Sequence, residues 1–302
     1  MQNLRYGFRF ISLSFKMAIE HESLQKPWML LSVGSLGLLL FWFVPMALVL
    51  GLIGLTSLGL FFIGLISVLL LISLTIWAEI TALGTCQIFN SVVVDPEEPT
   101  EVLTEVHEQP KGLSNRWDQI VILVLLQPAL KIQSWLVQIL SKKPTDNLDW
   151  LSSSGLMLPI IAIEEADLSG GVARIRQIMA DSLLRFRPEF IRVNLIARAA
   201  QWVMVVLGVV AGILAGLTLS DPQTASAGRL ILGSGVGMLI ALIFVVAGLS
   251  FSTFIRACYH AALLIWVKNT EKARRTGDTK FAAPPTIIGQ VLGVVSSGKE
   301  DN

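Results

Sequence analysis

Ionisable side chains are missing from long stretches of this chain. Between Lys26 and Glu79 there is none, and further uncharged runs cover residues 199–220 and 230–255. Only 15% of the 302 residues are charged, whereas an average soluble domain has about 25%. Hydrophobic residues make up 53%, and the mean hydropathy is +0.68. The net charge of +1 offers no bulk attraction for nucleic acid, so nucleic-acid binding is not expected.

Reactive and metal-binding residues are equally scarce. The two cysteines, Cys86 and Cys258, lie near the ends of apolar stretches and indicate packing residues rather than a disulfide framework. The three histidines are isolated from one another, and the chain has no H-E-x-x-H, G-x-S-x-G or P-loop motif. We therefore expect no metal, no cofactor and no enzymatic activity.

The uncharged runs predict membrane-spanning helices. Hydrocarbon about 30 Å thick is crossed by about 20 helical residues, so residues 27–78 are long enough for two spans. A turn is expected at residues 51–57, where glycines and hydroxyl residues cluster. Two more spans are predicted at residues 195–219 and 229–249.

The middle of the chain leaves the number of spans open. Residues 117–163 contain shorter apolar stretches, which predict two short spans joined at residues 142–147. A re-entrant or interfacial pair that never crosses is the alternative, and it would give four spans. The predicted fold class is therefore all-α: a polytopic transmembrane helix bundle of about six spans with amphipathic cytoplasmic helices.

The predicted domains follow the distribution of charge. Residues 1–27 form an amphipathic interfacial helix, 28–268 a transmembrane domain with cytoplasmic segments at 91–116 and 164–192, and 269–302 a cytoplasmic tail. In the first segment an apolar face recurs at steps of four and three residues, which is helical periodicity: Leu4, Phe8, Ile11, Phe15 and Ala18. This face is expected to lie in the membrane interface, or else to pack against the bundle.

Lysine and arginine predict the orientation. With the amino terminus inside, only four of the 23 basic residues remain for the outer side or the membrane, namely Lys131, Lys142, Lys143 and Arg229. Five tryptophans lie near the same cytoplasmic boundary, as an aromatic belt would: Trp28, Trp77, Trp117, Trp202 and Trp266. The expected location is the bacterial inner membrane, with both termini in the cytoplasm.

Glycines four residues apart predict helix packing. Small residues at this spacing let two helices approach closely in lipid, and the last two predicted spans contain five of them: Gly208, Gly212, Gly216, Gly233 and Gly237. These spans are expected to form a hairpin, while a glycine-lined pathway or a dimer seam is the alternative.

Four charged residues are predicted to be buried or close to the hydrocarbon, where charges usually pair, snorkel or face the bundle interior: Glu79, Lys131, Arg256 and Glu164. A pair between Glu79 and Arg256 is one alternative, and independent snorkelling is the other. Seven basic residues are predicted to face lipid or a partner: Arg5, Arg9, Lys16, Arg174, Arg176, Arg185 and Arg187.

The segment Leu158-Pro159-Ile160-Ile161-Ala162-Ile163-Glu164 is followed by a helix containing Ala173, Arg174 and Arg176. This pattern, with the Asp95-Pro96 turn and the charged, proline-bearing tail, resembles a family of poorly characterised bacterial six-span membrane proteins. More distantly, it is similar to the membrane domain attached to some glycerophosphodiester phosphodiesterases. The resemblance implies a six-span fold, but it covers no phosphodiesterase catalytic domain and therefore implies no such activity.

A second resemblance concerns the residues Glu165-Ala166-Asp167 with Gly171. They are similar to the first half of the coupling loop of ABC-importer permeases, whose Ile-x-Leu-Pro ending is absent here. The sequence thus favours a non-enzymatic membrane scaffold that binds lipids and either a protein partner or a second copy of itself. A transport component, permease subunit or carrier of a small solute or lipid, is the alternative.

Overall fold

The computed structural model describes residues 2–54, 56–94, 121–122, 154–180, 188–220, 227–277 and 284–292. Within these ranges the chain is helical and contains no strand, so the predicted all-α class is confirmed. Four helices in this part of the chain are long and apolar enough to cross a membrane: α2 (Glu22–Leu52), α3 (Ser57–Val94), α9 (Pro188–Ser220) and α10 (Ala227–Thr276).

The side chains of these helices need apolar surroundings that the protein itself does not supply. In the most apolar windows of α2, α3 and α9 only 11% of the residues are buried, and in that of α10 33%. Large exposed side chains of this kind, such as Phe41, Leu71 and Ile213, are stable in hydrocarbon and costly in water. The four helices therefore mark a membrane-embedded protein.

The count of about six spans is not confirmed. Of residues 117–163 the structure describes only 121–122 and the end of the segment, 154–163. There a 3-10 turn, η1 (Ser154–Leu156), leads into α7 (Met157–Ile163). With seven residues, α7 is about 10 Å long, and most of its side chains are buried in protein. By itself α7 is too short to cross a bilayer.

The chain divides into two compact units, and the division falls inside α2, α3, α9 and α10. One unit, here named the span unit, comprises residues 28–78 and 197–253. The other, named the terminal unit, comprises residues 1–27, 79–196 and 254–302 and so includes both chain ends.

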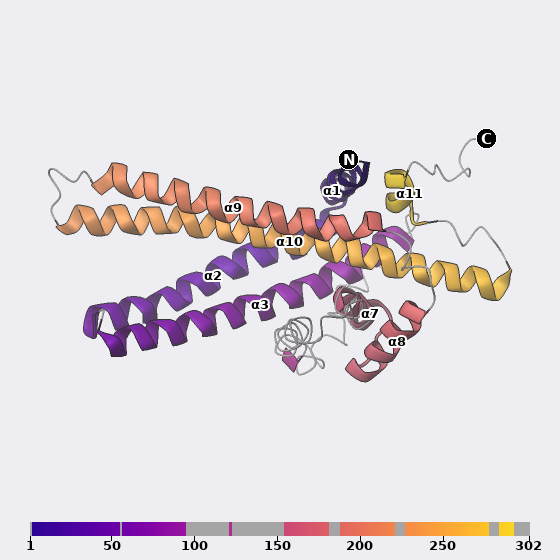
Figure 1. Cartoon of the computed structure of the whole chain (residues 1–302), viewed down its shortest axis with the longest axis horizontal. Helices are drawn as coiled ribbons and strands as arrows, with labels where there is room; N and C mark the ends of the chain where they lie inside the picture. Colours follow the sequence, from indigo (N-terminus) through magenta and orange to yellow (C-terminus); the bar gives the residue numbers. More distant parts are fainter. Residues whose placement is uncertain are drawn as a thin grey trace, which may run out of the picture. The chain divides into compact units, whose positions relative to one another are not determined.

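In the span unit α2 and α3 lie antiparallel, side by side, and α9 and α10 do the same (Figure 1). The turn from α2 to α3 lies inside the predicted segment 51–57. Gly54 adopts a left-handed φ of 67°, which glycine tolerates without strain. The Thr56 hydroxyl accepts a hydrogen bond from the Gly59 amide at 3.2 Å and caps the start of α3. Helix α2 continues through Pro45.

The two hairpins of the span unit meet at an apolar cluster. Leu39 of α2, Leu74 of α3 and Val246 of α10 are buried together. Beside them, the Ser32 hydroxyl donates to the hydroxyl of Ser250 at 3.1 Å. Hydroxyls that bond each other in this way keep polar atoms satisfied between helices that face lipid.

In its described residues the terminal unit contains four short α-helices in addition to the ends of the long ones. They are α1 (Gln2–Glu20), α7, α8 (Leu168–Ala180) and α11 (Thr286–Leu292). Helix α1 packs against α11, and α7 packs against α8. Fully buried side chains from six helices fill its core: Phe10, Phe89, Ile160, Ile175, Phe254, Leu264 and Ile288.

Candidate functional site

The chain between α7 and α8 reverses direction over four residues, Glu164 to Asp167. Glu165 has a φ of +53°, a left-handed conformation that costs a non-glycine residue about 1–2 kcal/mol. Asp167 caps the following helix: its Oδ1 accepts a hydrogen bond from the Gly170 amide at 2.8 Å. Its Oδ2 accepts another from the Ser169 hydroxyl at 2.8 Å. This reversal holds Glu164 beside the first turns of α8.

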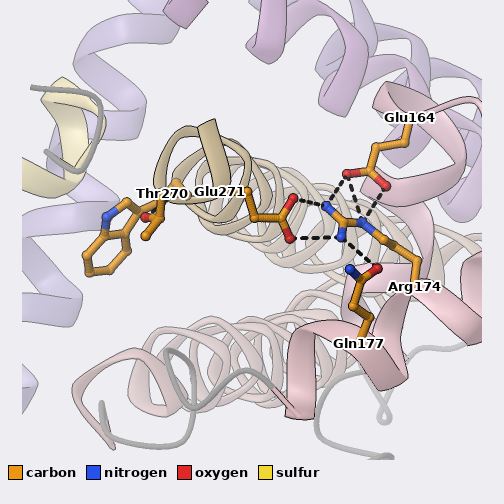
Figure 2. A network of polar contacts seen from close by, with 6 residues as sticks. Glu164, Arg174, Gln177, Thr270 and Glu271 are labelled. Atoms are coloured by element: carbon orange, nitrogen blue, oxygen red, sulfur yellow. Dashed lines mark hydrogen bonds and ion pairs between the residues drawn. The ribbon is translucent and has the colours of Figure 1, made fainter. Parts of the chain in front are cut away.

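Arg174 on α8 lies between two carboxylates, as Figure 2 shows. Its Nε donates to Glu164 at 2.9 Å (Oε2) and 3.2 Å (Oε1), and Nη2 donates to Glu164 Oε1 at 3.1 Å. On the other side, Nη1 and Nη2 donate to the two oxygens of Glu271, in α10, at 2.8 and 2.7 Å. Nη1 also donates to Gln177 Oε1 at 3.1 Å.

These contacts use all five N–H donors of the guanidinium group. Each carboxylate is held by two donors in the fork geometry that arginine provides and lysine does not. From the sequence, Arg174 is predicted to face lipid or a partner. In the structure its guanidinium group instead binds two carboxylates of its own chain.

Charge and burial make this cluster a strong intramolecular link. Two carboxylates and one guanidinium carry a formal charge of −1, and their side chains are 16–18% exposed. The hydrogen bonds that Arg174 donates to Glu271, followed by those to Glu164, raise its pKa above the ordinary value, although burial opposes this. Arg174 therefore stays charged throughout the physiological range, and the cluster ties the α7–α8 turn to α10.

A second polar contact lies in the same unit, between α9 and α10. Asn194 Nδ2 and His260 Nε2 are 3.1 Å apart, and the histidine is 7% exposed. Gly155 lies directly against the imidazole ring: a Cβ at that position would overlap the ring atoms. Nearby, Gln87 of α3 donates to the carbonyl of Ala162 at 3.4 Å. Polar side chains thus link α3 to α7 and α9 to α10.

Helix α1 has a protein-facing side and an exposed side. Phe10, Ser14 and Ala18 are at most 2% exposed. The Phe10 ring meets the Tyr259 ring edge-on, with centroids 5.7 Å apart. The apolar face predicted for the membrane is split: Ala18 is buried in protein, whereas Leu4 and Phe8 are exposed. Ile11 and Phe15 lie between, half-buried.

The other predicted site residues fall into three groups. Arg5, Arg9, Lys16 and Arg176 are exposed, and Lys16 lies 3.7 Å from Glu20 of the same helix. Glu79 and Arg256 are half-buried in the terminal unit, on α3 and α10, and their pairing stays a prediction. Lys131, Arg185 and Arg187 lie outside the described residues.

The five glycines of α9 and α10 form a close contact in the span unit. A Cβ on Gly212 would overlap the carbonyl oxygen of Gly237, and a Cβ on Gly237 would overlap that of Gly212. Gly216 approaches the Gly233 carbonyl, and Gly208 approaches Phe244. The absent side chains are what allow the two backbones to touch.

Sequence patterns gave no sign of Glu271, Gln177, Asn194 or helix α11. Glu271 is 97 residues from Arg174 along the chain, and it lies in a charged stretch that resembles any solvated helix end. The residues that the structure describes contain no cluster of histidine, cysteine, aspartate and glutamate suited to a metal ion. The polar contacts of this site are ion pairs and hydrogen bonds that link helices to one another.

Comparison with other proteins adds no family assignment. No protein-family model matches the sequence, and neither a curated protein nor a solved structure matches it.

Proposed function

We propose that this chain is a non-enzymatic scaffold of the bacterial inner membrane. Both termini lie in the cytoplasm, and the terminal unit binds a protein partner or the lipid surface. About six spans are proposed, the four long helices and two within residues 117–163. The four apolar helices and the bias of lysine and arginine support this orientation.

The observation that carries the proposal is the link around Arg174. It joins the α7–α8 turn to α10, two segments far apart in the chain, through partly buried charge-assisted hydrogen bonds. A link of this kind fixes the shape of a unit whose outer surface carries exposed arginines such as Arg176. A fixed, charged surface attached to membrane helices suits recognition better than it suits solute passage.

The proposal is tested by site-specific photo-cross-linking in intact cells. A photoreactive amino acid replaces the exposed Arg176 of α8, and a matched one replaces the exposed Leu214 of α9. Position 176 is expected to give a discrete protein or headgroup adduct, while position 214 gives adducts with lipid acyl chains. If position 176 yields neither kind of adduct, the recognition role is wrong.

A transport component is the second candidate function, favoured by one observation. Polar side chains are buried between helices that are long enough to span, including His260 with Asn194 and the half-buried Glu79 and Arg256. Ionisable residues inside membrane helices often line substrate or proton pathways.

The two native cysteines separate the two functions. Cys86 on α3 and Cys258 on α10 are both buried, in the same unit as these polar groups. In native membranes a scaffold with a dry core should leave both thiols unreactive toward a small water-soluble methanethiosulfonate until detergent unfolds the chain. Rapid reaction in the native state would instead favour a wet pathway and the transport role.

A further inference from the structure

The exposed side of α1 contains two parallel strips of different character. Successive residues of a helix point about 100° apart, so residues at steps of four and seven share one side. The first strip is apolar and comprises Leu4, Phe8, Phe15 and Ile19. Leu4 is 42% exposed, Phe8 61% and Ile19 75%. Phe15 is half-buried, and its ring reaches that of Phe254 in α10 at 6.1 Å.

The second strip is basic along the first three of these positions, each time one residue after the apolar one, whereas Ile19 is followed by Glu20, which lies 3.7 Å from Lys16. Arg5 follows Leu4, Arg9 follows Phe8, and Lys16 follows Phe15. All three basic side chains are exposed. The apolar strip therefore lies between the protein-facing side and the basic strip, along most of the length of α1.

We propose that this double strip is seated in an anionic phospholipid leaflet, with the apolar strip among the acyl chains and the basic strip among the headgroups. This rests on the proposed placement of the terminal unit at the cytoplasmic face, and it names the lipid surface as the occupant of α1. The buried side of α1 then contacts protein, the apolar strip contacts hydrocarbon, and the basic strip contacts headgroups.

The length of chain to the first spanning helix supports a bilayer as the occupant. Only eight residues, 21–28, separate Glu20 from Met29, which is 61% exposed and begins the apolar surface of α2. Seven of these eight belong to α2 and rise about 1.5 Å each. Because the connection is so short, the carboxyl end of α1 stays within reach of the bilayer surface.

The arrangement of charge supports anionic lipid as the chemistry recognised. A helix lying in the interface buries its apolar side to the level where the acyl chains begin, which places neighbouring side chains at phosphate depth. Arg5 and Arg9 are one turn apart and both exposed, so both can reach that depth together. If an apolar helix of another protein covered the apolar strip instead, the basic strip would have no negative charge to bind.

Packing against protein fixes which side of α1 faces outward. Ile287, Ile288 and Val291 of α11 are at most 4% exposed, and α11 packs against α1. With Phe10 and Ala18 turned inward, α1 cannot rotate to hide Phe8 without exposing its packed side. The apolar strip is therefore held in the exposed position before any lipid binds.

The test uses full-length protein in nanodiscs and a bimane fluorophore attached to a new cysteine. Phe8→Cys reports on the apolar strip, and Glu20→Cys, also exposed but one turn after Lys16 on the charged side of α1, is the matched control. Cys86 and Cys258 are buried, and wild-type protein carried through the same labelling gives the background. Quenching is measured with acyl-chain-brominated phosphatidylglycerol or phosphatidylcholine.

The bimane at residue 8 is expected to be quenched strongly and the one at residue 20 weakly. Equal quenching at the two positions would overturn the seating in the bilayer and leave a protein as the occupant of the strip. Such a failure would leave the recognition role intact if cross-links from Arg176 persist, so the two proposals can fail separately.

The charge requirement is tested on the same label. Brominated phosphatidylglycerol, diluted into unbrominated phosphatidylcholine, is expected to quench residue 8 more than brominated phosphatidylcholine at equal content. Each basic residue near an anionic surface contributes about five-fold to this preference, so Arg5→Gln with Arg9→Gln should reduce it by up to about 30-fold. An unchanged preference in the double variant would overturn the assignment to anionic lipid.

Discussion

The glycine contact between α9 and α10 gives the sharpest prediction about stability, the exchange Gly237→Ala. A Cβ at Gly237 would overlap the Gly212 carbonyl and come close to Gly216, and these are backbone atoms that no side-chain rotation can move away. The two helices must therefore separate. The matched control is Gly235→Ala on the same helix, where a Cβ meets open space.

The magnitude follows from comparing the two exchanges. Both replace glycine by alanine inside α10, so the gain in helix propensity, about 0.5–1 kcal/mol, is common to both and cancels in the difference. What remains is the cost of overpacking, about 1–3 kcal/mol. The upper part of that range is expected, because separation at Gly237 also loosens the contacts of Gly208 and Gly216.

The assay is denaturation by sodium dodecyl sulfate in mixed micelles, followed by circular dichroism, with the free energy of unfolding compared between the variants. Gly212→Ala should behave like Gly237→Ala. The double variant should lose less than the sum of the two, because one separation of the helices relieves both overlaps. Gly212→Leu, which adds more atoms to the same contact, should prevent folding or assembly. Equal stability of Gly237→Ala and Gly235→Ala would refute the reasoning.

Two further predictions concern the terminal unit. Arg174→Lys keeps the charge but loses the paired hydrogen bonds to Glu164 and Glu271, so a loss of about 1.5–3 kcal/mol in unfolding free energy is expected. The control Arg176→Lys, an exposed position on the same helix, should change stability by less than about 0.5 kcal/mol in the same titration. Gly155→Ala should displace the His260 ring, because the new methyl would occupy its position. A chemical shift of the His260 ring that equals wild type in nuclear magnetic resonance spectra would contradict that contact.

The sequence determined the membrane character of the protein. Runs such as residues 27–78 contain no charge, and no soluble core can accept so much apolar surface in so long a helix. It also located the turn within residues 51–57, because glycine and a capping hydroxyl are local signals. The number of spans stayed open, because the apolar stretches of residues 117–163 are near the minimum length for crossing.

Only the tertiary structure decided which charges and faces meet. Arg174 looked like any surface arginine of an amphipathic helix, and its partner Glu271 is 97 residues away. No periodicity links two such positions, because their distance depends on how α8 and α10 pack. The same holds for α1: its sequence shows which residues are apolar, but packing against α10 and α11 decides that Phe10 is buried and Phe8 exposed. Local pattern determines helices and their polarity, whereas the neighbour of each face depends on contacts between distant segments.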